Sequence, residues 1–181
     1  MTHPDPLPGD PSAEDVLHRM IRVDHAGEYG ATRIYAGQLA VLGRGPRGDV
    51  LRHMLGQEQA HLTAFNALAA ERRVRPTALL PLWHLAGFAL GAATAVLGER
   101  AAMACTVAVE EVIDAHYTDQ IERLAETEAP LRETLEKFRA EEREHRDTAL
   151  AHGAEQAPGY RLLSAVIRTG CRIAIRLSER V

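Results

Sequence analysis

Two short motifs in the sequence place a glutamate and a histidine one helical turn apart. Both have the form Glu-x-x-His, one from Glu58 to His61 and the other from Glu142 to His145. Residues i and i+3 lie on the same face of an α-helix, so the two side chains of each motif can reach the same point. The chain has 25 acidic residues and nine histidines, so one such motif is expected by chance. Further residues must therefore support the pair.

A glutamate precedes each motif at a similar distance. Glu28 lies 30 residues before Glu58, and Glu110 lies 32 residues before Glu142. Such a gap suits two antiparallel helices joined by a short loop, so each half of the chain is predicted to form a helical hairpin. Two hairpins that face each other would bring together six candidate metal ligands: Glu28, Glu58, His61, Glu110, Glu142 and His145. Four glutamates and two histidines are the ligand set of a ferritin-like di-iron or di-manganese bundle.

The candidate glutamates interrupt apolar stripes. Glu58 shares its helix face with Leu51, Leu55, Leu62 and Phe65, and Glu142 shares its face with Leu135, Phe138 and Ala149. An unpaired carboxylate buried there would cost several kcal/mol, and four together would repel one another. Two divalent cations would neutralise them. Carboxylate and imidazole ligands fit iron or manganese, and the absence of cysteine from the set argues against a thiolate zinc or iron–sulfur site.

Glu110 competes with its neighbour Glu111 for the fourth carboxylate position. Glu110 aligns with the apolar Val107 and Met103, whereas Glu111 follows alanines, so Glu110 is favoured. A glutamate taken singly is more often a surface or salt-bridge residue. That role is expected for Glu111, Glu141 and Glu144.

Four other polar residues lie near the candidate ligands in the sequence. Asp24 and Asp114 are each one helical turn from a candidate glutamate, and either could orient a ligand histidine. Tyr117 lies two turns after Glu110 on the same face, with His116 beside it. This pair could contact a substrate or an electron donor. The alternative is a core tyrosine and a surface histidine.

The elements that must position these residues are all predicted to be helices, because no window alternates polar and apolar residues as a strand does. Ser12 and Asp15 suit a capping box at the start of the first helix, and Asp49 could cap the second. The predicted fold is an all-α, ferritin-like four-helix bundle with two additional apolar or amphipathic helices. Its hairpins span residues 12–73 and 99–152, with breaks at 43–48 and 127–130.

The two additional helices are predicted at residues 78–97 and 160–180. The first stretch has no charged residue and is long enough to span a bilayer. A buried crossover helix, a helix lying on a membrane surface and a true span are the three interpretations. The second stretch alternates aliphatic residues with arginines, as in a basic amphipathic helix. It could pack on the bundle or contact anionic lipid.

Length, net charge and cysteine content limit the classes of protein that this chain could belong to. The length of 181 residues suits one domain, taken here as residues 12–181 after a disordered lead at 1–11. A net charge of −4 gives no indication of nucleic-acid binding. Two cysteines are too few for a disulfide framework and favour a reducing compartment. The N-terminal residues match neither a signal peptide nor a transit peptide.

Several stretches are similar to the demethoxyubiquinone hydroxylase family of ubiquinone biosynthesis. They are Val23–Ala31, Cys105–Glu111, His116–Tyr117, Gly170–Ala174 and Leu177–Arg180. The resemblance runs from about Val16 to the last residue and extends beyond the ligands to their flanking residues.

The resemblance implies a di-iron monooxygenase that uses O2 to hydroxylate the ring of a polyprenyl methoxy-benzoquinol. The six candidate ligands would hold two iron ions. His116 and Tyr117 would help electrons enter from the quinol or from an external reductant such as NADH. The implied partners are the quinol, O2 and a membrane surface, together with other ubiquinone-biosynthesis proteins or a second copy of the chain. The implied location is peripheral, on the cytoplasmic face of a bacterial inner membrane.

Other functions could use the same ligands. The main alternative is a ferritin-like protein that handles iron or scavenges peroxide. A cage ferritin would not need the apolar stretch at 78–97. A di-iron hydroxylase acting on tRNA and a membrane scaffold with merely structural acids are further alternatives, the former disfavoured by the net negative charge.

Overall fold

The structure is a computed structural model that describes residues 10–45 and 47–181. Within these residues the secondary structure is helical throughout, which confirms the predicted fold class. Most of the predicted disordered lead, residues 1–9, lies outside the described residues. The helices are α1 (Ala13–Leu42), α2 (Gly48–Glu71), α3 (Leu80–Val96), α4 (Glu99–Arg123), α5 (Ala129–Ala151) and α6 (Tyr160–Ser178), with single 3-10 turns η1 (Glu126–Glu128) and η2 (Ala154–Gln156).

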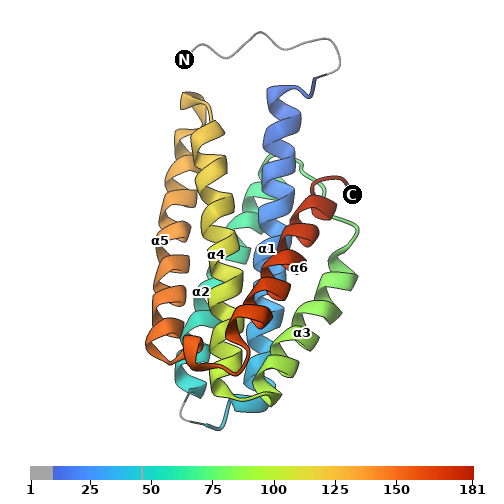
Figure 1. Ribbon diagram of the computed structural model, residues 1–181. Coiled ribbons are helices and arrows are strands. Elements are labelled where there is room, and N and C mark those ends of the chain that lie inside the picture. Colours follow the sequence, from blue (N-terminus) through green and yellow to red (C-terminus); the bar gives the residue numbers. More distant parts are fainter. Residues whose placement is uncertain (1–9, 46) are drawn as a thin grey trace.

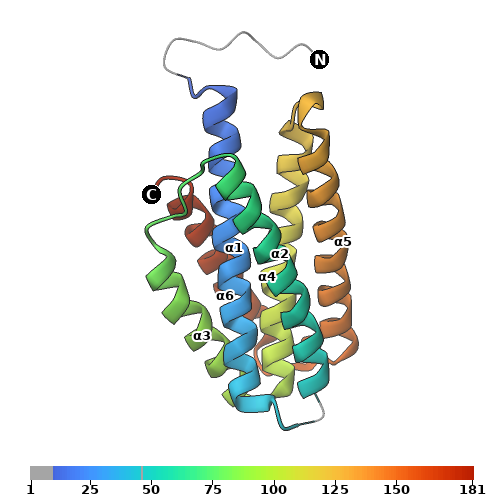
Figure 2. The ribbon, with the colours of Figure 1, turned by 180° about the vertical axis from the view of Figure 1, so that it is seen from behind.

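Four of the helices form the bundle. Helices α1 and α2 make one antiparallel hairpin, and α4 and α5 make the other (Figure 1). Helix α3 carries the chain from one hairpin to the other and packs along α1, while α6 packs on α4. The view from behind shows both extra helices on the same side of the bundle, away from α5 (Figure 2).

The predicted first cap is confirmed and the predicted second cap is wrong. The Ser12 hydroxyl accepts from the backbone N–H of Asp15 at 3.1 Å, and the Asp15 carboxylate accepts from the Ser12 N–H at 3.1 Å. Asp49, however, lies inside the first turn of α2 and pairs with Arg52 at 2.7 Å. The helix begins earlier because Gly48 lets the loop turn tightly: a Cβ there would come within 2.3 Å of the Gly43 carbonyl oxygen.

Helix α4 ends at Arg123, three residues earlier than the predicted break at 127–130 implies. The Arg132 guanidinium of α5 donates to the carbonyl oxygens of Ile121 and Leu124, at 2.6 Å each. These bonds satisfy carbonyls that an α-helix leaves unpaired at its end. The contact is between two helices, so it could not be read from the local sequence.

Close backbone contact joins α3 to α1. A Cβ at Gly91 would lie 1.9 Å from the Ile34 carbonyl oxygen, and one at Gly37 would lie 2.2 Å from the Phe88 carbonyl oxygen. Glycine is therefore required where the helices cross. The inner face of α3 packs as a crossover helix, but its outer face exposes large apolar side chains: Leu82, Leu85 and Phe88. No helix in the described part of the chain is long and apolar enough to cross a membrane, so the interpretation of residues 78–97 as a span is wrong.

Two of the apolar clusters in the core lie on either side of the candidate ligands. One contains Tyr35, Leu51 and Met103, and the other contains Phe65 and Leu135, each with further neighbours. The six candidate ligands fall between these clusters along the four helices. Packed side chains above and below hold the ligand-bearing turns of the helices in place.

Candidate metal centre

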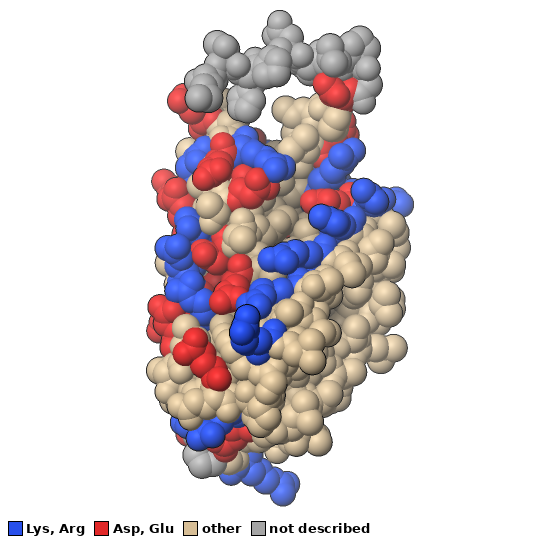
Figure 3. All heavy atoms as spheres, viewed as in Figure 1, with Lys and Arg blue, Asp and Glu red and all other residues tan. Residues whose placement is uncertain are grey.

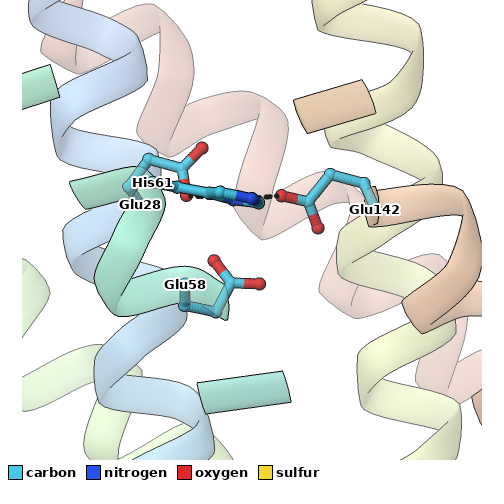
Figure 4. Close-up of side chains that lie close together, drawn as sticks. All are labelled: Glu28, Glu58, His61 and Glu142. Carbon is cyan, nitrogen blue, oxygen red and sulfur yellow. Dashed lines mark ion pairs between the residues drawn. The ribbon is translucent and has the colours of Figure 1, made fainter. Parts of the chain in front are cut away.

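All four bundle helices contribute to one buried polar cluster. Helix α1 supplies Glu28, α4 supplies Glu110, and α2 and α5 each supply the glutamate and histidine of their motif. None of the six side chains is more than 2% exposed. Figure 4 shows four of them pointing toward one another from three helices, with His61 between Glu28 and Glu142. The structure therefore brings together every residue predicted as a ligand.

The cluster divides into two overlapping groups. One contains Glu28, Glu58, His61 and Glu142; the other contains Glu58, Glu110, Glu142 and His145. Within each group the donor atoms lie within 4.8 Å of one another. Glu58 and Glu142 belong to both groups. Two ions held side by side would share these carboxylates, and each would have one glutamate and one histidine of its own.

Both histidines direct the same ring nitrogen into the cluster. Nδ1 of His61 lies 3.3 Å from Glu28 and 3.2 Å from Glu142. Nδ1 of His145 lies 3.2 Å from both Glu58 and Glu142. In each ring Nε2 points outward to a different partner. This is how a metal-binding imidazole is usually held, with one nitrogen on the metal and the other on a protein acceptor.

The cluster contains buried polar atoms without a hydrogen-bond partner. They are Glu28 Oε2, both oxygens of Glu58, His61 Nδ1, Glu110 Oε2 and Glu142 Oε1. A buried donor or acceptor left unpaired costs about 1–3 kcal/mol. Here the unpaired atoms converge on one region and are the donor types that iron and manganese bind. The residues present thus fit a pair of divalent metal ions.

The pKa values in the cluster are shifted because its carboxyl groups are buried close to one another and to two histidines. Burial raises the pKa of Glu28, Glu58 and Glu110, and repulsion by Glu142 acts in the same direction. Burial would also raise the pKa of Glu142, but the close imidazoles of His145 and His61 hold it at about 2. Burial would lower the pKa of His61, yet its carboxylate partners raise it to about 11. Without cations the cluster retains protons, which metal binding must displace.

Four residues surround the ligands, and of these only Tyr117 was identified from the sequence as a site residue. The Tyr35 hydroxyl donates to Glu110 at 2.8 Å, and the Tyr117 hydroxyl donates to Glu28. His61 Nε2 lies 2.5 Å from a Glu141 oxygen, and His145 Nε2 lies 3.0 Å from the Gln57 side-chain oxygen. Gln57 and Glu141 directly precede the glutamates of the two motifs. This shared position was the signal that could have identified them.

Neither Asp24 nor Asp114 contacts a ligand histidine, a role that the sequence left open for both. Asp24 lies 3.3 Å from His116 Nε2, and Asp114 pairs with Arg139 at 2.7 Å and with Arg143 at 3.0 Å. Among the acids expected at the surface, Glu144 is exposed and Glu111 pairs with Arg168 at 2.6 Å.

Glu141 is the exception to the surface expectation. Its side chain is only 26% exposed, because it reaches across from α5 to His61 on α2.

His116 and Tyr117 point in different directions. Tyr117 is 1% exposed and bonds to the cluster, whereas His116 turns toward Asp24 and Gln120. Their ring centres are 6.5 Å apart. Tyr117 is thus a core tyrosine that also contacts a candidate ligand. The His116 side chain is only 18% exposed, which argues against a simple surface histidine.

An apolar pocket of about 430 Å³ lies between α1, α3, α4 and α6. Its wall includes Gly27 and Ala31, which flank Glu28 on α1, and Val109, which precedes Glu110 on α4. No Cα atom of α3 lies within 8 Å of a Cα atom of α6. Across this gap Trp83 Nε1 donates to the Ser178 hydroxyl at 3.0 Å. An apolar molecule in the pocket would lie against α1 and α4, the helices that carry Glu28 and Glu110.

Comparison with known proteins gives consistent results. Residues 15–178 match the family described as "Ubiquinone biosynthesis protein COQ7". The chain is 60% identical to 3-demethoxyubiquinol 3-hydroxylase of Rhodospirillum rubrum over 181 residues, covering 99% of this chain and 85% of that one. It is 57% identical over 169 residues to the human mitochondrial NADPH-dependent 3-demethoxyubiquinone 3-hydroxylase, covering 91% and 78% respectively. It is 46% identical to the 5-demethoxyubiquinone hydroxylase of Saccharomyces cerevisiae over 182 residues, covering 91% and 78%.

Proposed function

The chain belongs to the COQ7 family of ubiquinone biosynthesis proteins, and from this premise we propose that its buried cluster binds two iron ions and uses O2 to hydroxylate a polyprenyl quinol. The chain is a 3-demethoxyubiquinol 3-hydroxylase. The observation that supports the di-iron part is the pair of overlapping buried ligand groups with two shared carboxylates. The ligands are Glu28, Glu58, His61, Glu110, Glu142 and His145.

The reaction adds one oxygen atom of O2 to the quinol ring and releases the other as water, which consumes two electrons and two protons. When bound, two ferrous ions would supply electrons to O2 without an organic cofactor. The chain's residues hold the reacting groups in place. Tyr117 fixes the outer oxygen of Glu28, and Tyr35 does the same for Glu110, so neither ligand is free to rotate away.

The apolar pocket is the proposed substrate site. Its lining consists almost wholly of glycine, alanine and aliphatic side chains, which suits a quinol ring and the start of a polyprenyl tail. Iron storage would need no such pocket. The pocket therefore favours hydroxylation over the iron-handling alternative.

His116 and Tyr117 are proposed to serve electron and proton entry. Asp24 lies beside His116, and through that contact it raises the pKa of the imidazole against the opposing effect of burial. Such a group can accept and release protons near neutral pH. Human and bovine relatives are named as NADPH-dependent. For this chain, either a reduced nicotinamide nucleotide or the quinol itself is the proposed electron source.

The exposed apolar face of α3 and α6 is the proposed membrane contact. Its exposed side chains include Leu85, Leu162 and Val166. Figure 3 shows a stripe of basic side chains beside this uncharged surface. Arg161, Arg172, Arg176 and Arg180 are the exposed arginines of this region. Aliphatic side chains beside arginines fit an anionic lipid surface, in a bacterium the cytoplasmic face of the inner membrane.

The test combines metal analysis with a product assay. The Glu58→Ala variant removes a carboxylate common to both ligand groups, so we expect loss of both irons and of the hydroxylated product. Wild-type protein should contain about two irons per chain and convert the demethoxy quinol. A variant with a full iron load and normal turnover would disprove the ligand assignment.

A further inference from the structure

The two halves of the cluster match in almost every respect. Each half supplies an unshared glutamate with a tyrosine donor: Tyr117 on Glu28 and Tyr35 on Glu110. Each also supplies a histidine that points Nδ1 inward. The residues that hold the outer nitrogens differ. His61 Nε2 contacts a carboxylate, Glu141, whereas His145 Nε2 contacts a neutral amide, Gln57.

The outer contacts cross between the two hairpins. Gln57 on α2 holds His145 on α5, and Glu141 on α5 holds His61 on α2. Each holding residue directly precedes the glutamate of its own motif. The repeated unit is therefore one residue longer than Glu-x-x-His, and its first position differs between the halves: Gln57 in one and Glu141 in the other.

This difference has a chemical consequence. A carboxylate that accepts the outer N–H of an imidazole makes its other nitrogen a more basic ligand, and a neutral amide does so less. The contact to Glu141 is also shorter, 2.5 Å against 3.0 Å. Lys137 approaches the other oxygen of Glu141 only at 3.9 Å and is 68% exposed, so it neutralises Glu141 little.

We propose that Glu141 and Gln57 are positioning residues that make the two metal positions unequal, so that a divalent ion binds the His61 position before the His145 position. This inference rests on the proposed metal function and adds an order of filling to it. Changes in such outer contacts typically alter metal affinity 10–100-fold. A difference of about tenfold between the two positions is therefore expected.

The experiment is a cobalt(II) titration of the metal-free full-length protein without oxygen. Cobalt(II) serves as a stand-in for ferrous iron, and its absorption gives the affinities. Hyperfine-shifted proton resonances of the outer imidazole N–H groups show which histidine is occupied. Wild type should bind two ions in two steps, with the His61 signal appearing first. Variants His61→Ala and His145→Ala assign the signals.

The variants exchange the two outer residues. Glu141→Gln should weaken the first step about tenfold and bring the two steps together. Gln57→Glu should strengthen binding at His145. The double exchange Gln57→Glu with Glu141→Gln should reverse the order of filling. Glu144→Gln is the matched control, since it removes an equal charge from an exposed neighbour on the same helix and should change nothing.

The outcomes distinguish the inferred order of filling from the proposed metal function. Equal steps in wild type, or an order that the double exchange leaves unchanged in a folded protein, would overturn the inference while the metal function stands. An effect of Glu144→Gln as large as that of Glu141→Gln would also overturn it, because general charge would then explain the difference. Failure of wild type to bind any ion would instead disprove the proposed metal function. Circular dichroism confirms that each variant is folded.

Discussion

Gly27 offers a direct test of whether the apolar pocket holds the substrate. A helix-interior glycine costs about 0.5–1 kcal/mol relative to alanine. At Gly37 and Gly91 this cost is offset, because the missing side chains let α1 and α3 pack closely. A Cβ at Gly27, in contrast, would meet nothing within 4 Å. Gly27 lines the pocket and precedes the candidate ligand Glu28. The open space beside Gly27 is explained if the flat ring of the substrate lies against α1 at this position.

The perturbation is Gly27→Ala. No atom obstructs the new methyl group, so the free energy of unfolding should rise by about 0.5–1 kcal/mol through helix propensity alone. The same methyl group would project into a pocket of about 430 Å³. One carbon of misfit in an apolar pocket costs about 1–3 kcal/mol of transition-state binding. We therefore expect kcat/KM for the quinol to fall at least about tenfold, with the iron content unchanged.

The assay pairs urea unfolding with steady-state hydroxylation, with iron measured on the same preparation. Gly56→Ala is the control: its Cβ also meets nothing within 4 Å, but Gly56 lies on α2 and outside the pocket. It should show the same gain in stability with normal kcat/KM. Equal activity of the two variants would refute the reasoning, because the space beside Gly27 would then have no role in substrate binding.

Three further predictions address other parts of the molecule. Tyr117→Phe and His116→Ala should keep two irons per chain but slow hydroxylation driven by reduced nicotinamide nucleotide. Hydroxylation driven by hydrogen peroxide should be less affected. Loss of iron from either variant would show a structural role instead. Arg172→Glu with Arg176→Glu should reduce sedimentation with anionic vesicles, since each arginine near such a surface contributes about 1 kcal/mol to the binding free energy. The control Lys137→Glu on α5 should leave sedimentation unchanged. Unchanged binding of the double variant would count against the proposed membrane face. Burial raises the pKa of Cys105 to about 12, so at pH 8 only about one thiol in ten thousand is ionised and Ellman's reagent should label it only after unfolding. Cys171 is less buried, so rapid labelling of both cysteines in the folded protein would contradict the burial of Cys105.

The ligand set was predictable because helical periodicity is a local property. The three-residue spacing of each motif and the apolar stripes around Glu58 and Glu142 determine which side chains face inward. Helix ends were less predictable. Asp49 has a good capping residue type, but the close approach of Gly48 to the Gly43 carbonyl moves the start of α2 ahead of it.

The outer contacts were not predictable for a different reason. Successive helical residues are about 100° apart around the axis, so Glu141 lies well to one side of the inward-facing Glu142. Whether that side meets solvent or another helix depends on where α2 packs. The sequence favoured solvent for Glu141 and allowed Asp114 as a residue that orients a ligand histidine. The packing reverses both, because α2 brings His61 to Glu141 while arginines of α5 surround Asp114.

Different helices form the two sides of the metal centre, one with the histidines and the other with the pocket. Both histidines and their outer partners lie on α2 and α5, and neither helix contributes a residue to the pocket. The pocket is instead built on α1 and α4, which each carry one unshared glutamate, and is enclosed by α3 and α6. Those two added helices also carry most of the exposed large apolar side chains. A substrate with a long apolar tail could therefore leave its tail at the α3–α6 surface while its ring lies behind Glu28 and Glu110. The same two helices that extend the basic four-helix bundle thus link the proposed membrane contact to the proposed reaction site.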